Sequence, residues 1–305
     1  MRDGLVKKEA IVMRKVIVFG GFGFLGFYLV KELLKRGYQV TVADISENNE
    51  LGGDIKQIKC DISIKRQVEE AFDLDSFDVV YNFAGFANLD VAIEFPIDTL
   101  NLNVIGNMYI LEECVKHKVS NFVYASSAYA MSNKGSFYGI SKLASEKIIE
   151  EYHKKYDLPF VILRYGSVYS ERAYDNNYIY SIVKNAVQNR EINHHGDGNE
   201  IREYIHASDA AKLSVDVMEL KEYNNLHVIL TGSERMKRME LFQMINEILN
   251  NEIEINCDDS GYQNHYKFTP YSFEPSVSKK LIANPHIDMG QGILECIRAV
   301  RSLED

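Results

Sequence analysis

The amino-acid sequence predicts an α/β fold in which a doubly wound parallel sheet carries a smaller C-terminal lobe. Two observations lead to this prediction. Short runs rich in β-branched residues alternate with longer amphipathic segments through the first half of the chain, and the first run passes directly into a glycine-rich turn and a helix. Strands that alternate with helices in this way form parallel sheets with helices on both faces.

The first half predicts five strands with one helix in each connection. The strands are expected over Lys15–Phe19, Gln39–Ala43, Val79–Tyr81, Asn121–Ala125 and Phe160–Leu163. The helices are expected over Phe24–Arg36, Ile64–Phe72, Ile97–Lys118 and Tyr138–Tyr156. Gly37 follows the first helix, where a residue in the left-handed conformation is typical.

The alternation becomes less regular after about Arg164. Loop-like residues over 194–199 interrupt it, and a segment over 285–304 is compatible with a helix. Because no Pro/Gly/Ser linker separates the halves, we expect a first domain over residues 1–165 and a lobe over 166–305 from which the chain returns to the sheet. Residues 1–12 precede the first strand and are expected to form a flexible extension.

The composition limits the kinds of partner. The 305 residues are 46% hydrophobic and carry a net charge of -10, with Lys and Arg scattered along helix faces, which argues against a nucleic-acid surface. No apolar run approaches the ~20 residues of a membrane helix, and the first residues lack the apolar core of a secretion signal. We therefore expect a cytoplasmic protein with neither a nucleic-acid nor a membrane partner.

No metal site is expected. The four cysteines are far apart and form no C-x-x-C pair, which predicts reduced thiols. His194 and His195 are adjacent, so their side chains point in different directions, and they have no spaced partner. We expect them in a solvated loop.

The glycine-rich turn predicts a phosphate-binding site. Gly20 permits a tight turn after the first strand, Gly23 lets a pyrophosphate approach the backbone, and Gly26 lets the helix pack closely on the strand. The helix then begins with Phe24 and Leu25, and its N-terminus offers unpaired N–H groups and a partial positive charge to phosphates. In this position the pattern predicts a Rossmann-type dinucleotide site.

The second expected strand leads to Asp44. A carboxylate at this place accepts both hydroxyls of an adenosine ribose and repels a 2′-phosphate, which favours NAD over NADP. The alternative interpretation of Asp44, a helix cap or surface turn, stays open.

Tyr138 and Lys142 are the expected catalytic pair. Their spacing of four residues places them on one helix face. A lysine ammonium beside a phenol favours the phenolate, which can take a proton from a substrate hydroxyl while a hydride leaves the carbon. Ser127, at the end of an expected strand, faces the crevice where parallel sheets bind ligands and can share the substrate hydroxyl with Tyr138. A cap role for Ser127 is the alternative.

Several motifs in this order resemble the extended short-chain dehydrogenase/reductases, in particular the NAD-dependent epimerases and dehydratases that act on nucleotide sugars. The resemblance runs from about Lys15 to about Lys212. Beside the glycine loop and Asp44, it rests on the segments Cys60-Asp61-Ile62, NFAG, NLNVIG, YASS, YGISK, LRYGSVY and GDGNEIREYIHASDAA.

The resemblance implies further contacts with the cofactor and the substrate. The implied cofactor contacts are Asp61 and Ile62 near adenine, Phe83, Ala84, Gly85 and Ser126 along the dinucleotide, and Tyr165 near the nicotinamide. Arg202 would hold the substrate diphosphate, with Ser167 beside it, and a guanidinium suits this task because its fork binds phosphate oxygens bidentately. A surface ion pair is the alternative for Arg202.

Three departures from the family pattern narrow the chemistry. Dehydratases of this family carry an Asp-Glu pair directly after the catalytic hydroxyl residue, whereas this chain has Ala128 and Tyr129 there. Ser127 and Tyr138 are only 138 − 127 = 11 positions apart, which is shorter than usual and suggests a more open pocket. Ser167 stands where the family usually has an asparagine.

The sequence therefore predicts an NAD-dependent oxidoreductase that oxidises C4 of a nucleotide-activated sugar. It would act as a 4-epimerase if the keto sugar is held and reduced again, or as a 4-dehydrogenase if the keto sugar leaves. A carbonyl reductase of a small non-nucleotide molecule and a non-catalytic NAD-binding regulator remain alternatives. The resemblance also implies a homodimer formed by the helices expected over 97–118 and 138–156.

Overall fold

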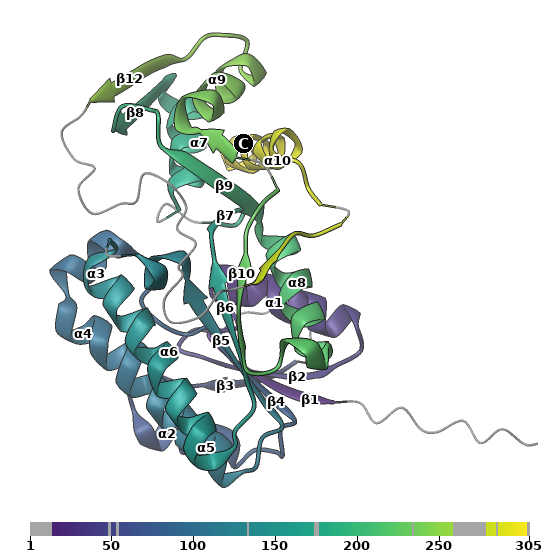
Figure 1. Ribbon diagram of the computed structural model, residues 1–305. Helices are drawn as coiled ribbons and strands as arrows, with labels where there is room; N and C mark the ends of the chain where they lie inside the picture. The colour runs from purple at the N-terminus through teal and green to yellow at the C-terminus, as the bar shows by residue number, and fades with distance from the viewer. Residues whose placement is uncertain are drawn as a thin grey trace, which may run out of the picture.

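The computed structural model describes residues 14–47, 50–52, 55–132, 134–173, 177–233, 235–258, 279–284 and 286–303. The extension expected over residues 1–12 lies outside them. The described chain forms a helix-covered sheet with a smaller lobe above it (Figure 1). None of the described helices is long and apolar enough to cross a membrane.

An eight-stranded parallel sheet forms the larger part. Its strand order is β13-β10-β6-β5-β4-β1-β2-β3. The strands are, in chain order, β1 (Lys15–Phe19), β2 (Gln39–Asp44), β3 (Lys56–Lys59), β4 (Val79–Asn82), β5 (Asn121–Ser127), β6 (Phe160–Tyr165), β10 (Leu226–Leu230) and β13 (Lys279–Leu281). Since β1 lies between β2 and β4, the direction of winding changes beside β1, which is where open α/β sheets bind their ligands.

Helices cover both faces of this sheet (Figure 1). One face carries α1 (Phe24–Lys35) and α8 (Ala207–Glu219). The other carries α2 (Lys65–Phe72), α3 (Leu89–Glu94), α4 (Pro96–Leu100), α5 (Asn107–Lys116) and α6 (Ser136–Tyr156). The doubly wound α/β fold predicted from the sequence is thus confirmed.

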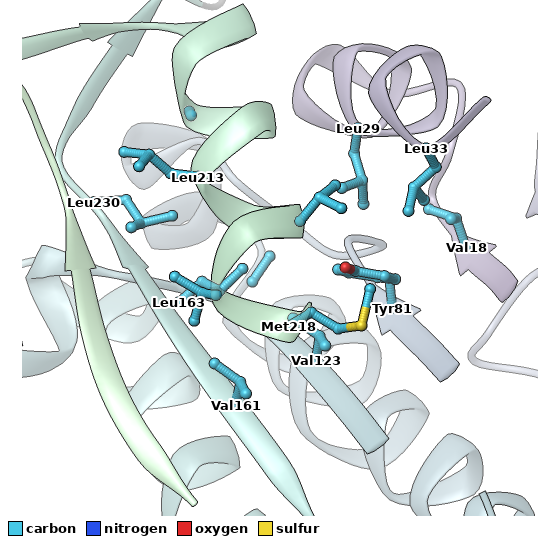
Figure 2. Close-up of a cluster of buried hydrophobic side chains, with 14 of the residues drawn as sticks. Val18, Leu29, Leu33, Tyr81, Val123, Val161, Leu163, Leu213, Met218 and Leu230 are labelled. Atoms are coloured by element: carbon cyan, nitrogen blue, oxygen red, sulfur yellow. The ribbon is translucent and has the colours of Figure 1, made fainter. Parts of the chain in front are cut away.

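The residues of β1 show why both faces are covered. Val16 and Val18 belong to the core beneath α1 and α8, whereas Ile17 and Phe19 belong to the core on the opposite face. Alternate side chains of a strand point to opposite faces, so an uninterrupted apolar strand needs a helical layer on each side. Figure 2 shows the core beneath α1 and α8, in which Leu29 of α1 lies among side chains from the strands and from α8.

The smaller lobe has its own apolar core. It contains β7 (Ser167–Tyr169), α7 (Tyr178–Asn189), β8 (Glu191–His195), β9 (Ile201–His206), β11 (Arg235–Lys237), α9 (Arg238–Ile248), β12 (Glu254–Asp258) and α10 (Met289–Ser302). Between these elements the chain returns to the large sheet as α8, β10 and β13, so the lobe is assembled from separate stretches.

Two sequence expectations about local structure are wrong. The helix expected over 97–118 is divided into α4, a π-helical segment (Asn101–Gly106) and α5. There the backbone carbonyl of Asn103 accepts a hydrogen bond from the Ser145 hydroxyl at 2.7 Å. A widened turn leaves such a carbonyl available to a neighbouring helix.

The second error concerns the two adjacent histidines, which lie in strand β8 instead of a solvated loop. The strand pairs in parallel with β12, with His194 opposite Cys257. His194 is buried, where it lies 2.7 Å from the Tyr178 hydroxyl and 3.1 Å from the Glu200 carboxylate, whereas His195 is exposed. The two rings point to opposite faces because successive side chains of a strand alternate between its faces, and not because of loop geometry.

Candidate active site

Two cavities open at the carboxyl ends of the sheet strands. One, of about 610 Å³, extends along the glycine turn and is called the cofactor cavity below. The other, of about 580 Å³, extends toward the small lobe and is called the substrate cavity. Ser127 and Tyr138 line both, so the two predicted catalytic hydroxyl groups stand where the cavities meet.

Most of the predicted cofactor residues line the cofactor cavity. They are Gly20, Gly23, Phe24, Leu25, Gly26, Phe83, Gly85, Ser126 and Tyr165, together with the catalytic Lys142. The structure thus brings together residues from four strand ends and from the starts of α1 and α6. The cavity therefore extends from the glycine turn, where phosphates are expected to bind, to the predicted catalytic residues.

The geometry of the turn fits a dinucleotide. Gly20 has φ +75°, and a Cβ there would lie 2.5 Å from the backbone nitrogen of Ala84. A Cβ on Gly26 would lie 2.0 Å from the carbonyl oxygen of Gly20. Helix α1 begins after Gly23 with no side-chain cap, so its first N–H groups remain available to a pyrophosphate.

Four predicted cofactor residues are not part of the lining of this cavity. They are Asp44, Asp61, Ile62 and Ala84. The Asp44 carboxylate accepts hydrogen bonds from the backbone N–H of Phe22, at 2.9 Å, and from Ser46. Asp44 therefore also braces the glycine turn, a contribution that the sequence interpretation did not include.

Tyr138 and Lys142 lie in the first two turns of α6. The Lys142 Nζ atom donates a hydrogen bond to the carbonyl of Ala125 at 2.9 Å and lies 5.9 Å from the centre of the Tyr138 ring. Burial lowers the pKa of Lys142 to about 8, against an opposing effect of Glu146. Even so, most of the amine is protonated at neutral pH, as its predicted role requires.

Ser127 is the last residue of β5. Its hydroxyl oxygen accepts a hydrogen bond from the backbone N–H of Tyr129 at 3.2 Å. Because this contact occupies a lone pair, the serine proton remains available for a substrate oxygen. The short connection to α6 turns at Gly135, which has φ +94° and whose added Cβ would lie 2.7 Å from the Tyr129 ring.

The substrate cavity contains both residues that were expected to contact the substrate. Arg202 lines it with only 2% of its surface exposed, and its guanidinium donates to the carbonyl of Ile201 at 3.0 Å. Ser167 lines it as well. The placement of Arg202 inside a cavity disfavours the alternative of a surface ion pair.

Sequence reasoning missed two other residues of this cavity. Arg238 is buried at the start of α9, with its guanidinium carbon 3.5 Å from the centre of the Tyr178 ring. Neither Arg238 nor Tyr178 belongs to a motif, and the two come into contact because α7 packs against α9. A second buried arginine makes the cavity more favourable for an anionic ligand.

Comparison with known proteins agrees with this geometry. The model of the NAD dependent epimerase/dehydratase family matches residues 16–229. The chain belongs to this family. Its cofactor is accordingly NAD, and the glycine turn and cofactor cavity described above fit that molecule.

Two relatives illustrate the range of the family. A putative UDP-glucose 4-epimerase of Methanocaldococcus jannaschii is 26% identical over 307 residues, which cover 94% of this chain and 98% of that protein. A dTDP-D-glucose 4,6-dehydratase of Dictyostelium discoideum is 25% identical over 262 residues, which cover 74% of this chain and 60% of that protein.

A solved structure shows the same fold. It is the UDP-glucuronic acid 4-epimerase of Bacillus cereus with UDP-glucuronic acid and NAD, which aligns with a TM-score of 0.82 at 21% identity. The alignment covers 95% of this chain and 99% of that one.

Proposed function

We propose that this family member oxidises C4 of a nucleotide-activated sugar and, by reducing the keto intermediate on its other face, acts as a sugar-nucleotide 4-epimerase. The observation that carries the proposal is the position of Ser127 and Tyr138 at the junction of the cofactor and substrate cavities. Relatives named as UDP-glucose 4-epimerases support it. A sugar diphosphate suits the substrate cavity because Arg202 and Arg238 both line it.

The chain's own residues divide the proton chemistry between them. NAD, when bound, accepts and returns the hydride. Tyr138 takes the proton of the substrate hydroxyl as general base and returns it as general acid in the reverse direction. Ser127 donates a hydrogen bond to the same oxygen, and the Lys142 ammonium favours the phenolate form of Tyr138.

The residues after Ser127 argue against loss of water. Ala128 is buried and Tyr129 lines the substrate cavity, and neither side chain is a carboxylate that could carry the protons of an elimination. We propose on this ground that dehydration is not the reaction, although relatives of the family include 4,6-dehydratases.

The mass of the product tests the proposal. The protein is incubated with a panel of UDP-, dTDP- and GDP-sugars, and the products are separated and weighed, with Tyr138→Phe as the inactive control. An isomer of unchanged mass supports the epimerase, and a product lacking two hydrogens identifies a 4-dehydrogenase. Loss of water would contradict the argument from Ala128 and Tyr129, and no turnover of any nucleotide sugar would refute the substrate class.

We also propose that the protein is a homodimer. Large apolar side chains are exposed on the neighbouring helices α4 and α6, among them Ile97 and Ile140, which are 72% and 59% exposed. Such patches on a folded domain mark contact surfaces. A second copy that packs the same helices would cover them.

A further inference from the structure

Helix α6 is joined to β5 by two consecutive contacts beneath the catalytic residues. Tyr138, Lys142 and Glu146 follow one another at four-residue intervals and so share one face of α6. Lys142 donates to the carbonyl of Ala125, at 2.9 Å, and the hydroxyl of the next residue, Ser126, donates to the Glu146 carboxylate at 2.5 Å. The residue after that is Ser127.

A buried ionic network holds the Glu146 carboxylate in place. Glu146 is 0% exposed, and Arg164 of β6 donates to its two oxygens at 2.9 and 2.7 Å. His227 of β10 lies 3.5 Å from the same carboxylate and 2.9 Å from Glu150. Although burial alone would raise the pKa of Glu146, the hydrogen bonds from Arg164 and the proximity of His227 lower it to about 2, so this side chain is a carboxylate at neutral pH.

We propose that Glu146 is a positioning residue, which fixes α6 against β5 and supplies the negative charge that keeps the Lys142 amine protonated. This inference rests on the proposed function, because it assigns Glu146 to the same proton-transfer site. The contacts to Ala125 and Ser126 set where Tyr138 and Lys142 stand relative to Ser127.

The surroundings of Lys142 show why a charge is needed there. Its Nζ atom lies 4.9 Å from the centre of the Tyr124 ring, on β5, and 5.9 Å from that of Tyr138. Burial raises the pKa of the Tyr124 phenol, so this ring and the Ala125 carbonyl bring no negative charge to Lys142. Arg164 and His227 both contact the Glu146 carboxylate. Burial therefore disfavours the ammonium form of Lys142, and Glu146 is the group that opposes this effect.

Chemical labelling of Lys142 measures this effect without any substrate. The full-length protein, freed of nucleotide, is treated briefly with acetic anhydride across a range of pH, and acetylation of Lys142 is followed by mass spectrometry. Only the unprotonated amine reacts, so the midpoint of the labelling curve reports its protonation. Glu146→Gln keeps a hydrogen-bond acceptor for Ser126 but removes the charge, and Glu146→Asp keeps the charge.

We expect the Glu146→Gln midpoint to fall by at least about one pH unit, the size of effect that one nearby opposite charge produces. Glu146→Asp should stay near wild type. Glu150→Gln is the matched control, because Glu150 contacts His227 but not Ser126, and its midpoint should not move. Should Glu146→Gln fold poorly beside an unpaired Arg164, the double variant Glu146→Gln/Arg164→Gln removes both charges. It should show a smaller fall, because loss of the Arg164 cation partly offsets loss of the Glu146 anion.

An unchanged midpoint in a folded variant that lacks the Glu146 charge would overturn the proposal. The result is independent of the substrate assignment. If the midpoint falls but no nucleotide sugar is turned over, the proposed function fails and the role of Glu146 in holding the Lys142 charge stands.

Discussion

The ring of Tyr129 packs edge-to-face on the ring of Tyr138, with their centres 6.1 Å apart and their planes at 71°. Tyr129 lines the substrate cavity but not the cofactor cavity, whereas Tyr138 lines both cavities. Tyr129 therefore lies beside Tyr138 on the wall of the substrate cavity and not on that of the cofactor cavity. In a chain with a short connection between Ser127 and α6, this ring forms part of the wall of the substrate cavity.

Removing the Tyr129 ring should weaken substrate binding more than cofactor binding. We expect Tyr129→Ala to raise KM for the nucleotide sugar about 2- to 10-fold, the effect of losing one aromatic contact of roughly 0.5 to 1.5 kcal/mol, with NAD affinity unchanged. Tyr129→Phe keeps the ring and should remain within about 2-fold of wild type. Steady-state kinetics and an NAD titration by fluorescence measure both. Equal losses of NAD and sugar affinity would contradict this placement of Tyr129.

Gly26→Ala should disrupt the cofactor site. The added Cβ would lie 2.0 Å from the carbonyl oxygen of Gly20, and a backbone atom in a tight turn cannot move aside cheaply. We expect a loss of roughly 1 to 3 kcal/mol of folding free energy and a clear fall in NAD affinity. Gly290→Ala in the first turn of α10 is the control. Among the described residues its Cβ would meet only a side-chain oxygen of Asp288, at 3.3 Å, and helices favour alanine over glycine.

Thermal unfolding with and without NAD separates the two effects of Gly26→Ala. Wild type and Gly290→Ala should gain Tm when NAD is added, because a ligand that binds the folded state stabilises it. Gly26→Ala should gain little. A normal NAD-induced rise in Tm for Gly26→Ala would show that the turn tolerates a side chain.

The sequence predicted those parts of the fold that local pattern determines. The strand at Lys15–Phe19 and the start of the helix at Phe24 were predicted at their observed positions, because the apolar run and the glycine turn are both local signals. Strand β3 was missed, since Ile58 is the only apolar residue of Lys56–Lys59 and the strand lies at the sheet edge. The π-helical segment depends on the contact between Asn103 and Ser145, which are distant in the chain.

The same distinction applies to the candidate site. Ser127, Tyr138 and Lys142 belong to short motifs, so sequence spacing was enough to propose them. Arg238 meets Tyr178 only through the packing of the small lobe, and no local pattern distinguishes it from Arg235 and Lys237, which precede it. Sequence therefore predicted which hydroxyl groups lie where the two cavities meet, and it missed part of the substrate cavity.

Arg202 should determine affinity for the diphosphate of the substrate. Its buried guanidinium lines the substrate cavity, and loss of a charged, two-pronged contact is expected to weaken binding about 10- to 100-fold. Arg202→Ala should show the full loss. Arg202→Lys should recover part of it, because an ammonium keeps the charge but not the fork.

Calorimetric titration with UDP and with a UDP-sugar measures the effect of the Arg202 variants, and NAD affinity serves as the internal control. Unchanged affinity for both nucleotides in Arg202→Ala would argue against a diphosphate ligand. A small carbonyl substrate would then become the better interpretation.

Stability should decline in acid partly through Glu171. Burial alone would raise the pKa of this half-buried carboxyl group, but hydrogen bonds from His206 and Tyr28 lower it from 4.5 to about 2. The unfolded chain therefore binds more protons than the folded chain between these values. The contribution of Glu171 is present above about pH 4.5 and is lost as the pH falls toward 2.

Glu171→Gln should consequently be less stable than wild type at neutral pH and should lose less further stability between pH 5 and 3. Urea unfolding at a series of pH values measures this. Glu151→Gln is a suitable control, because Glu151 is exposed and, in the described part of the chain, forms its ion pair with Lys154. Parallel stability curves for wild type and Glu171→Gln would show that the contacts with His206 and Tyr28 contribute nothing to acid sensitivity.

The exposed apolar surface of α4 and α6 leads to a prediction about assembly. Ile97 and Ile140 are 72% and 59% exposed, and an aspartate at either place would put a charge into an interface that excludes water. We expect the double variant Ile97→Asp/Ile140→Asp to have half the mass of the wild-type particle in light scattering. Leu220→Asp, at the end of α8, changes a residue that is 48% exposed on the opposite face of the sheet and should leave the mass unchanged. A wild-type protein that is already monomeric would refute the dimer, and a dimer that survives both aspartates would place its interface elsewhere.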